Sequence, residues 1–171
     1  MGLFSTKRTE KLVPVDAPQS SVGAPLPTVM ASEQCLYVCY LLSAPDPQWD
    51  GSAVRLVGPD SSGEPIAVVK VKHCRAHTFG PPNDEAIGGH RLAKLGLMPY
   101  STYEVLDSLW IAELENANRV HHRHDGRLFA NLRHFIFTFH DSTLEFVSEG
   151  FEVNVTSGSI RGVLRDLADA I

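Results

Sequence analysis

The sequence has few cysteines, no excess of basic residues and no long hydrophobic run. Its 171 residues include three cysteines, and in an extended strand Cys35 and Cys39 would lie about 13 Å apart, too far for a disulfide. Apolar stretches such as residues 36–42 are much shorter than the ~20 residues of a membrane-spanning helix. No apolar signal segment opens the chain, so we expect a cytoplasmic protein with free cysteines and no membrane span.

The charge balance and the absence of known motifs exclude further classes of protein. Acidic residues number 20 and basic residues 15, a net charge of −5, so the chain lacks the basic surface of a nucleic-acid-binding protein. No Gly-x-Ser-x-Gly, GxGxxG, phosphate-loop or CxxC motif occurs, which argues against a serine hydrolase and a nucleotide-binding enzyme. With 43% hydrophobic residues, the chain can form the core of one domain.

Two parts are expected along the chain. Residues 1–33 contain prolines among Ser, Gly, Ala and Thr and show no periodic apolar pattern, which predicts a flexible tail. Residues 34–171 are expected to form a single α+β domain, a mostly antiparallel sheet of about six strands with two helices covering one face. The apolar patterns predict strands at 36–42, 54–57, 66–71, 102–106, 134–139 and 144–153, and helices at 108–118 and from 160 onward.

The last two of these strands form the clearest element, a β-hairpin. A two-residue turn between them would pair His134 with Glu149 and would make His140 a diagonal neighbour of Glu145. His–carboxylate pairs would then lie on one polar face of the hairpin. The opposite face is predicted to be core, because it carries Phe135, Phe137, Phe139, Leu144 and Phe146.

Residues 78–100 show no periodicity and are rich in Gly and Pro, which predicts a long irregular loop with a functional role. Asn83 and Asp84 within this loop are candidate ligand-binding residues. Arg75 lies shortly before it and is a candidate partner for an anion, because a guanidinium group binds a carboxylate through two parallel hydrogen bonds.

Eight histidines are the one unusual feature of the composition. Histidine is the commonest metal ligand in proteins, so each cluster is a candidate site for a divalent ion of the zinc type. His122 and His124 lie two residues apart after a predicted helix and could chelate one ion. The other candidate ligands are His73, His77 and His90 near the loop, and His134, His140 and Glu145 on the hairpin.

Two functions stay open at this point. The absence of a nucleophile with a base and an orienting residue favours a non-catalytic, soluble module that binds a partner protein or a small ligand through the 78–100 loop. The alternative is a His/carboxylate metalloprotein, or a metal-dependent enzyme acting on a small anionic substrate, in which at least three of the candidate side chains meet in one pocket. A homodimer is a further hypothesis, since four large aromatic side chains could anchor an interface: Tyr37, Tyr40, Trp49 and Trp110.

Overall fold

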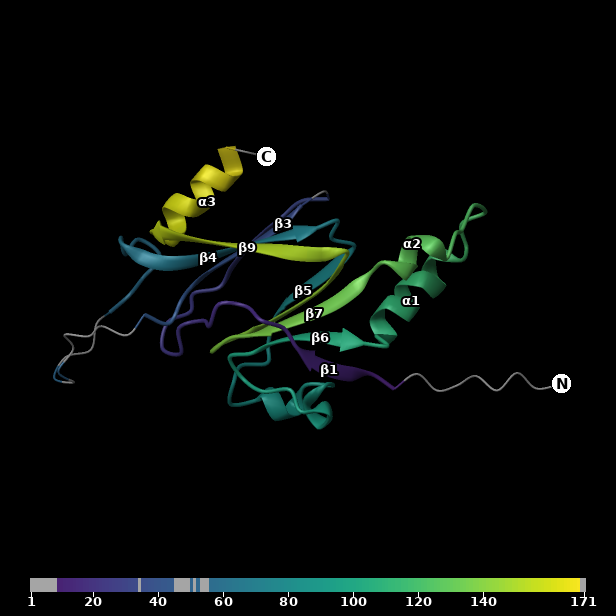
Figure 1. Ribbon diagram of the computed structural model, residues 1–171, viewed down its shortest axis with the longest axis horizontal. Helices are drawn as coiled ribbons and strands as arrows, with labels where there is room; N and C mark the ends of the chain where they lie inside the picture. The colour runs from purple at the N-terminus through teal and green to yellow at the C-terminus, as the bar shows by residue number, and fades with distance from the viewer. Residues whose placement is uncertain (1–8, 34, 45–49, 51, 53–55, 170–171) are drawn as a thin grey trace.

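A computed structural model describes residues 9–33, 35–44, 50, 52 and 56–169. In this part of the chain, strands form two antiparallel sheets and helices lie against their outer faces, so the protein is a single α+β domain (Figure 1). The predicted fold class is confirmed. The single sheet that we expected is instead divided into two.

The larger sheet has five strands, and all of its neighbouring strands are antiparallel. It carries the candidate site on its outer face. From one edge to the other, its order is β1 (Lys11–Pro14), β6 (Thr102–Leu106), β7 (Arg133–Thr138), β8 (Thr143–Ser148) and β5 (Ala76–Gly80).

The smaller sheet is continuous with the larger one through a sharp corner after β8. Gly150 has a φ of +146°, a conformation that favours glycine, and its N–H donates to Ser148 Oγ at 3.1 Å. This corner lets the chain leave one sheet and enter the other. The smaller sheet has the order β2 (Thr28–Ala31), β3 (Leu36–Leu41), β4 (Glu64–Lys72) and β9 (Gly150–Gly158).

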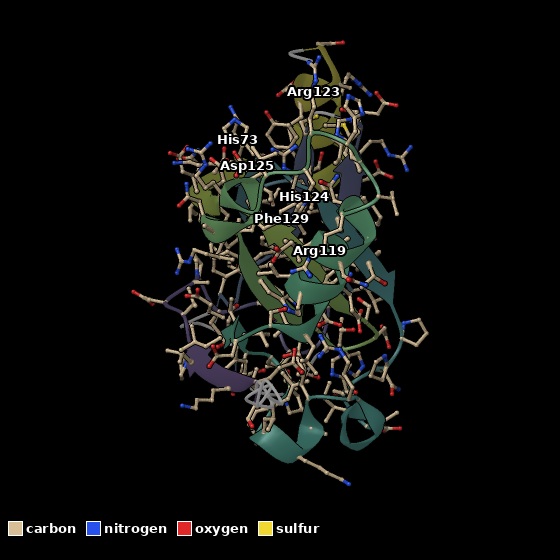
Figure 2. The ribbon with its side chains drawn as sticks, turned by 90° about the vertical axis from the view of Figure 1, so that its right-hand side faces the viewer. His73, Arg119, Arg123, His124, Asp125 and Phe129 are labelled. Carbon is tan, nitrogen blue, oxygen red and sulfur yellow. The ribbon has the colours of Figure 1, made fainter. Side chains whose placement is uncertain are left out.

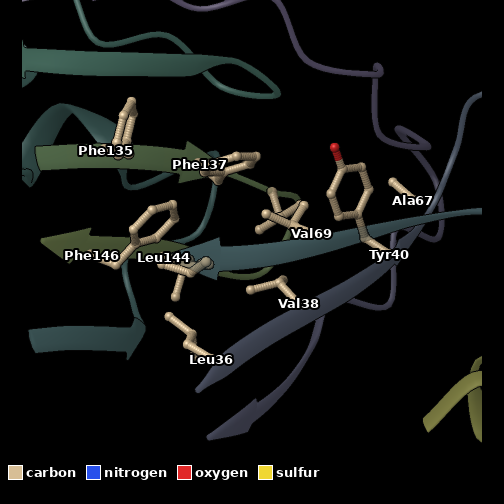
Figure 3. Packing of buried hydrophobic residues seen from close by; sticks show 11 residues of the cluster. Leu36, Val38, Tyr40, Ala67, Val69, Phe135, Phe137, Leu144 and Phe146 are labelled. Carbon is tan, nitrogen blue, oxygen red and sulfur yellow. The ribbon is translucent and has the colours of Figure 1, made fainter. Parts of the chain in front are cut away.

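The main core lies between the two sheets (Figure 3). Alternate residues of β7 and β8 face alternate residues of β3 and β4, as the period of two along a strand requires. Burial of each large apolar side chain stabilises the fold by roughly 1.5–3 kcal/mol. The predicted core face is confirmed, since Phe135, Phe137, Phe139, Leu144 and Phe146 are all at most 2% exposed.

The register of the predicted hairpin is wrong by two residues. His134 pairs with Val147 and Ile136 pairs with Glu145, because residues 139–142 form the connection in place of a two-residue turn. Phe139 N–H closes that connection by donating to Ser142 O at 2.8 Å. A shift of two residues keeps every side chain on its predicted face but changes its neighbours.

The predicted tail is also corrected. In the described part of the first 33 residues, β1 pairs with β6 and β2 pairs with β3, each as an edge strand. Edge strands tolerate proline such as Pro14, since one side of an edge strand forms no ladder bonds. These strands are four residues long, too short to give a periodic signal. Of the strand predicted at 54–57, residues 54 and 55 lie outside the described part and residues 56 and 57 form no strand.

The helices cover both sheets, whereas we expected them on one face. Helix α3 (Ile160–Asp169) packs on the outer face of the four-stranded sheet, against Cys39, Leu41 and Ile66. Helices α1 (Leu109–Asn118) and α2 (Arg127–Ala130) lie beside the five-stranded sheet (Figure 1). Helix α3 and the pair α1 and α2 therefore lie on different sheets.

The 78–100 segment is built into the fold and is not an open loop. Residues 78–80 belong to β5, and two short 3-10 helices follow, η1 (Ile87–Gly89) and η2 (Ala93–Leu95). Leu92 and Leu97 of this segment pack against Val105 and Ile136 on the outer face of the five-stranded sheet. The segment therefore covers part of the outer face of the five-stranded sheet.

Of the aromatic side chains expected to anchor a homodimer, one is buried in the core and one lies outside the described residues. Tyr40 is 1% exposed and its hydroxyl donates to Pro18 O at 2.9 Å, so it belongs to the core and cannot anchor an interface. Trp49 lies outside the described residues.

The three cysteines are free, as predicted. No helix in the described ranges is long and apolar enough to cross a membrane.

Candidate functional site

Glu145 is the centre of a buried polar cluster on the outer face of the five-stranded sheet. It lies on β8, and its side chain is 9% exposed. Its Oε2 accepts from His134 Nε2 at 2.9 Å and from Arg91 Nη2 at 2.8 Å, and its Oε1 contacts His90 Nε2 at 3.2 Å. We call these four residues the Glu145 cluster.

The proton positions in the cluster follow from the partners of each ring. His90 Nδ1 accepts the backbone N–H of Leu92 at 3.2 Å, so Nε2 carries the proton that His90 donates to Glu145. An ionised carboxylate only accepts, so His134 Nε2 is also a donor. Both rings therefore direct N–H groups, and not lone pairs, at Glu145.

These contacts hold Glu145 in its charged form. Burial alone would raise the pKa of the Glu145 carboxyl, but the hydrogen bonds from His134 and His90 and the positive charge of Arg91 lower it well below its ordinary value. A carboxylate has about four acceptor sites, of which the three donors use three. Glu145 is therefore an anion with one acceptor site left, and too weak a base for proton transfer near neutral pH.

Arg91 connects the cluster to the N-terminal strand and to helix α1. Its Nη1 donates to both oxygens of Glu10, at 3.1 and 2.9 Å, and Glu10 Oε1 accepts the backbone N–H of Leu109 at 3.0 Å. Glu10 precedes β1 and Leu109 is the first residue of α1. One guanidinium group thus links two carboxylates from different parts of the chain, and Glu10 lies 81 residues away from Arg91. Each of the two carboxylate side chains is 9% exposed, so both charged hydrogen bonds are largely shielded from water.

A cavity of about 460 Å³ lies beside the cluster. Three carboxylates and one guanidinium line it, so its formal charge is −2. Glu113 has no hydrogen-bond or ion-pair partner among the described residues. The ring of Trp110 meets that of His134 edge to face at 5.1 Å. The lining residues are Glu10, Thr78, Arg91, Leu109, Trp110, Glu113 and Glu145.

A chain of polar contacts runs from Ser108 through His134 to Glu145. Ser108 Oγ lies 2.8 Å from His134 Nδ1, and His134 Nε2 in turn bonds to Glu145. A serine, a histidine and a carboxylate in this order also make up a catalytic triad. Ser108 is 4% exposed, however, and its oxygen also accepts the Ile111 N–H at 3.2 Å as the N-cap of α1. The helix predicted at 108–118 is confirmed as α1, and the role of Ser108 is to hold His134 and the start of this helix.

Asp84 and His140, two of the predicted site residues, meet in a second and more exposed cluster. Asp84 Oδ2 contacts His140 Nδ1 at 3.0 Å and accepts from the Tyr100 hydroxyl. Hydrogen bonds from Tyr100 and then His140 lower the pKa of Asp84, and the bond to Asp84 raises the pKa of His140. Asn83 closes the adjacent turn by accepting the Ala86 N–H at 3.0 Å. Asn83 and Asp84 therefore hold the segment in place.

The remaining predicted metal ligands are dispersed. His73 pairs with Glu149 at 2.7 Å, His77 is exposed on β5, His122 stacks on His121, and His124 contacts Asn118 at 3.0 Å. Among the predicted metal ligands, all of which lie in the described part of the chain, only His90, His134 and Glu145 come together. In the described ranges, no group of three or more His, Cys, Asp or Glu side chains is arranged to hold a metal ion.

Sequence reasoning missed Arg91, a member of the Glu145 cluster, and Glu10, the second partner of Arg91. Glu10 belongs to the segment that we expected to be a tail, and no local pattern marks Arg91.

A comparison with known protein families, with curated proteins and with solved structures finds no match to this chain. What the fold and the site define is a two-sheet α+β protein with a buried, charged cluster beside a cavity.

Proposed function

We propose that this protein is a cytoplasmic, non-catalytic binding module that takes a small organic cation in the cavity beside Glu145. The observation that carries the proposal is a buried carboxylate, kept ionised by three donors, at the wall of a cavity of about 460 Å³. This volume is within the range of roughly 300–1,000 Å³ that small-molecule sites occupy. Thr78 and Arg91 bring the 78–100 segment into the site, as the sequence-based hypothesis requires.

Three features of the lining favour a positively charged ligand. The formal charge of −2 attracts cations, and Glu113 is free to form an ion pair with one. The aromatic ring of Trp110 offers an apolar and cation-attracting surface. An anionic ligand would instead meet three carboxylates, and the single positive charge of Arg91, which is shared between Glu10 and Glu145, offsets only one of them. A primary amine on an aromatic or short aliphatic body matches this lining.

Calorimetric titration with phenethylamine, 2-phenylethanol and 3-phenylpropionate tests the proposal, because the three probes share a ring and differ in charge. We expect only the amine to bind measurably. The substitution Glu113→Gln should weaken its binding about fivefold, the loss of one exposed ion pair. The matched control is Asp166→Asn, an exposed acid on α3, which should leave the affinity unchanged. Equal binding of the alcohol or the acid would contradict the proposal.

The metalloprotein alternative has its best location at the Glu145 cluster, where His90, His134 and Glu145 meet. The chain's own residues oppose a zinc-type ion there, because both histidines present N–H groups and the Arg91 guanidinium lies 2.8 Å from the carboxylate. Metal analysis of protein purified without added metal distinguishes the two functions. One equivalent of zinc, lost in the variant His90→Ala, would favour the metalloprotein.

A further inference from the structure

A second pocket of about 440 Å³ lies between helices α1 and α2. It shares no lining residue with the Glu145 cavity. Apolar side chains dominate its lining, and no carboxylate side chain takes part. Leu128 is 60% exposed at this place although it is a large hydrophobic residue. The lining residues are Arg75, Leu114, Ala117, Asn118, Leu128, Phe129 and Leu132.

Arg75 supplies the one formal charge in this lining. Its backbone N–H donates to Val147 O at 2.8 Å, which fixes its position just before β5. Its side chain is exposed, and its guanidinium has no hydrogen-bond or ion-pair partner among the described residues. An unpaired guanidinium at an apolar pocket matches a ligand that carries a carboxylate.

The connection next to the pocket, which we call the loop and take as residues 119–127 to include Arg127 at the start of α2, is basic although the whole chain is acidic. It contains three arginines and one aspartate, a charge of +2 with its histidines neutral, in a chain of net charge −5. Arg119 pairs with Glu115 and Arg127 with Asp125, whereas Arg123 has no acidic partner in the described part of the chain. Figure 2 shows the labelled side chains of this loop on the same side of the molecule as Phe129.

The loop and the pocket are in direct contact. The ring of His124 packs on that of Phe129 with 6.0 Å between the ring centres, and His124 Nδ1 contacts Asn118 Oδ1 at 3.0 Å. Phe129 and Asn118 both line the pocket. The basic loop therefore lies directly against the lining of the pocket.

We propose that this pocket is a separate binding site for a small amphipathic carboxylate, such as a medium-chain fatty acid. The apolar tail lies against Leu128, Phe129 and Leu132, and the carboxylate pairs with Arg75. The site is independent of the Glu145 cavity, which takes a ligand of the opposite charge. Either site can therefore fail its test without affecting the other.

Calorimetric titration with octanoate and with octylammonium tests this site, because the two probes have the same apolar tail and opposite charges. We expect octanoate to bind, and octylammonium to bind about tenfold more weakly or not at all. Arg75→Gln should weaken octanoate binding about tenfold, since it removes the charged hydrogen bonds. Lys94→Gln, an exposed cation on η2, is the matched control and should change nothing.

A second variant and a competition experiment locate the ligand. Leu128→Asp places a negative charge at an exposed position of the pocket, so it should abolish octanoate binding without unfolding the protein. A saturating amount of phenethylamine should leave octanoate binding unchanged. Equal affinity for the two probes, unchanged affinity in Arg75→Gln, or no binding of octanoate would each overturn the proposal.

Discussion

His134 on β7 donates to Glu145 on β8 at 2.9 Å, although the two residues are not opposite each other in the ladder. The contact is diagonal, and it lies under helix α1 and the segment that carries His90 and Arg91. Because neither side chain is more than 9% exposed, the bond forms in a medium of low dielectric constant, where a missing partner is costly. This pair therefore determines both the charge at the cavity and part of the stability of the fold.

Replacing Glu145 by Gln should lower the free energy of unfolding by about 3 kcal/mol, because His90, His134 and Arg91 lose the anion that they share. Chemical denaturation measures this loss. The pKa of Glu145 is lowered by folding, so its stabilising effect is complete at neutral pH and is lost as the pH falls below its ordinary value of 4.5. The acid-induced loss of stability should be smaller in Glu145→Gln, and an equal loss in both proteins would contradict this.

Ser108→Ala should cost more stability than Ser159→Ala. Each serine accepts a backbone N–H at the start of a helix, from Ile111 and Gly162, and loss of such a cap costs about 1 kcal/mol. Ser108 also contacts His134, so its removal leaves a buried ring nitrogen without a partner, which adds roughly 1–3 kcal/mol. Thermal unfolding of the two variants measures the difference, and equal costs would mean that the Ser108–His134 contact contributes nothing.

A pair of substitutions in β1 distinguishes a strand from a flexible tail. Leu12 packs against the apolar cluster around Ile136, so Leu12→Asp should destabilise the protein by about 2 kcal/mol. Its neighbour Val13 is 41% exposed, and Val13→Asp should cost markedly less. Urea denaturation of both variants provides the test. If neither substitution changes the midpoint, residues 11–14 do not form the strand.

Asp84→Asn should bring the pKa of His140 down toward its ordinary value of 6.5, because the hydrogen bond to Asp84 is the main cause of its increase. Since folding raises this pKa, the pair stabilises the protein below pH 6.5, and this contribution is lost as the pH rises through the folded pKa. NMR titration of the His140 ring measures the change. Asp141→Asn is the control, since Asp141 lies 4.0 Å from His140 and acts only through its charge, so its effect should be smaller.

Alternation within residues 135–146 is enough to predict the hairpin and its core face, since the period of two depends only on local geometry. The two-sheet arrangement and strands β1 and β2 could not be predicted in this way. Both strands are only four residues long, and β1 owes its place to β6, a strand far along the chain, whereas β2 pairs with the next strand, β3.

The candidate site was predicted only in part, because its contacts also depend on residues that are distant in the sequence. His90, His134 and Glu145 were candidates by residue type, whereas the register that places His134 beside Glu145 depends on the connection at residues 139–142. The link from Arg91 to Glu10 spans 81 residues, and no sequence pattern records it. Arg75 was expected to bind an anion, and the pocket beside it is formed by apolar residues of α1 and α2 and by Leu132, which lie far from Arg75 in the sequence.

Two-dimensional NMR of the protein during titration with phenethylamine tests the central claim most directly. A cation in the Glu145 cavity should shift the indole N–H of Trp110 and the amides of Thr78 and Arg91, and these shifts should be absent with 3-phenylpropionate. Resonances of α3, on the other side of the protein, should stay in place. An unchanged Trp110 signal at saturating amine, or equal shifts with the acid, would contradict a cation site beside Glu145.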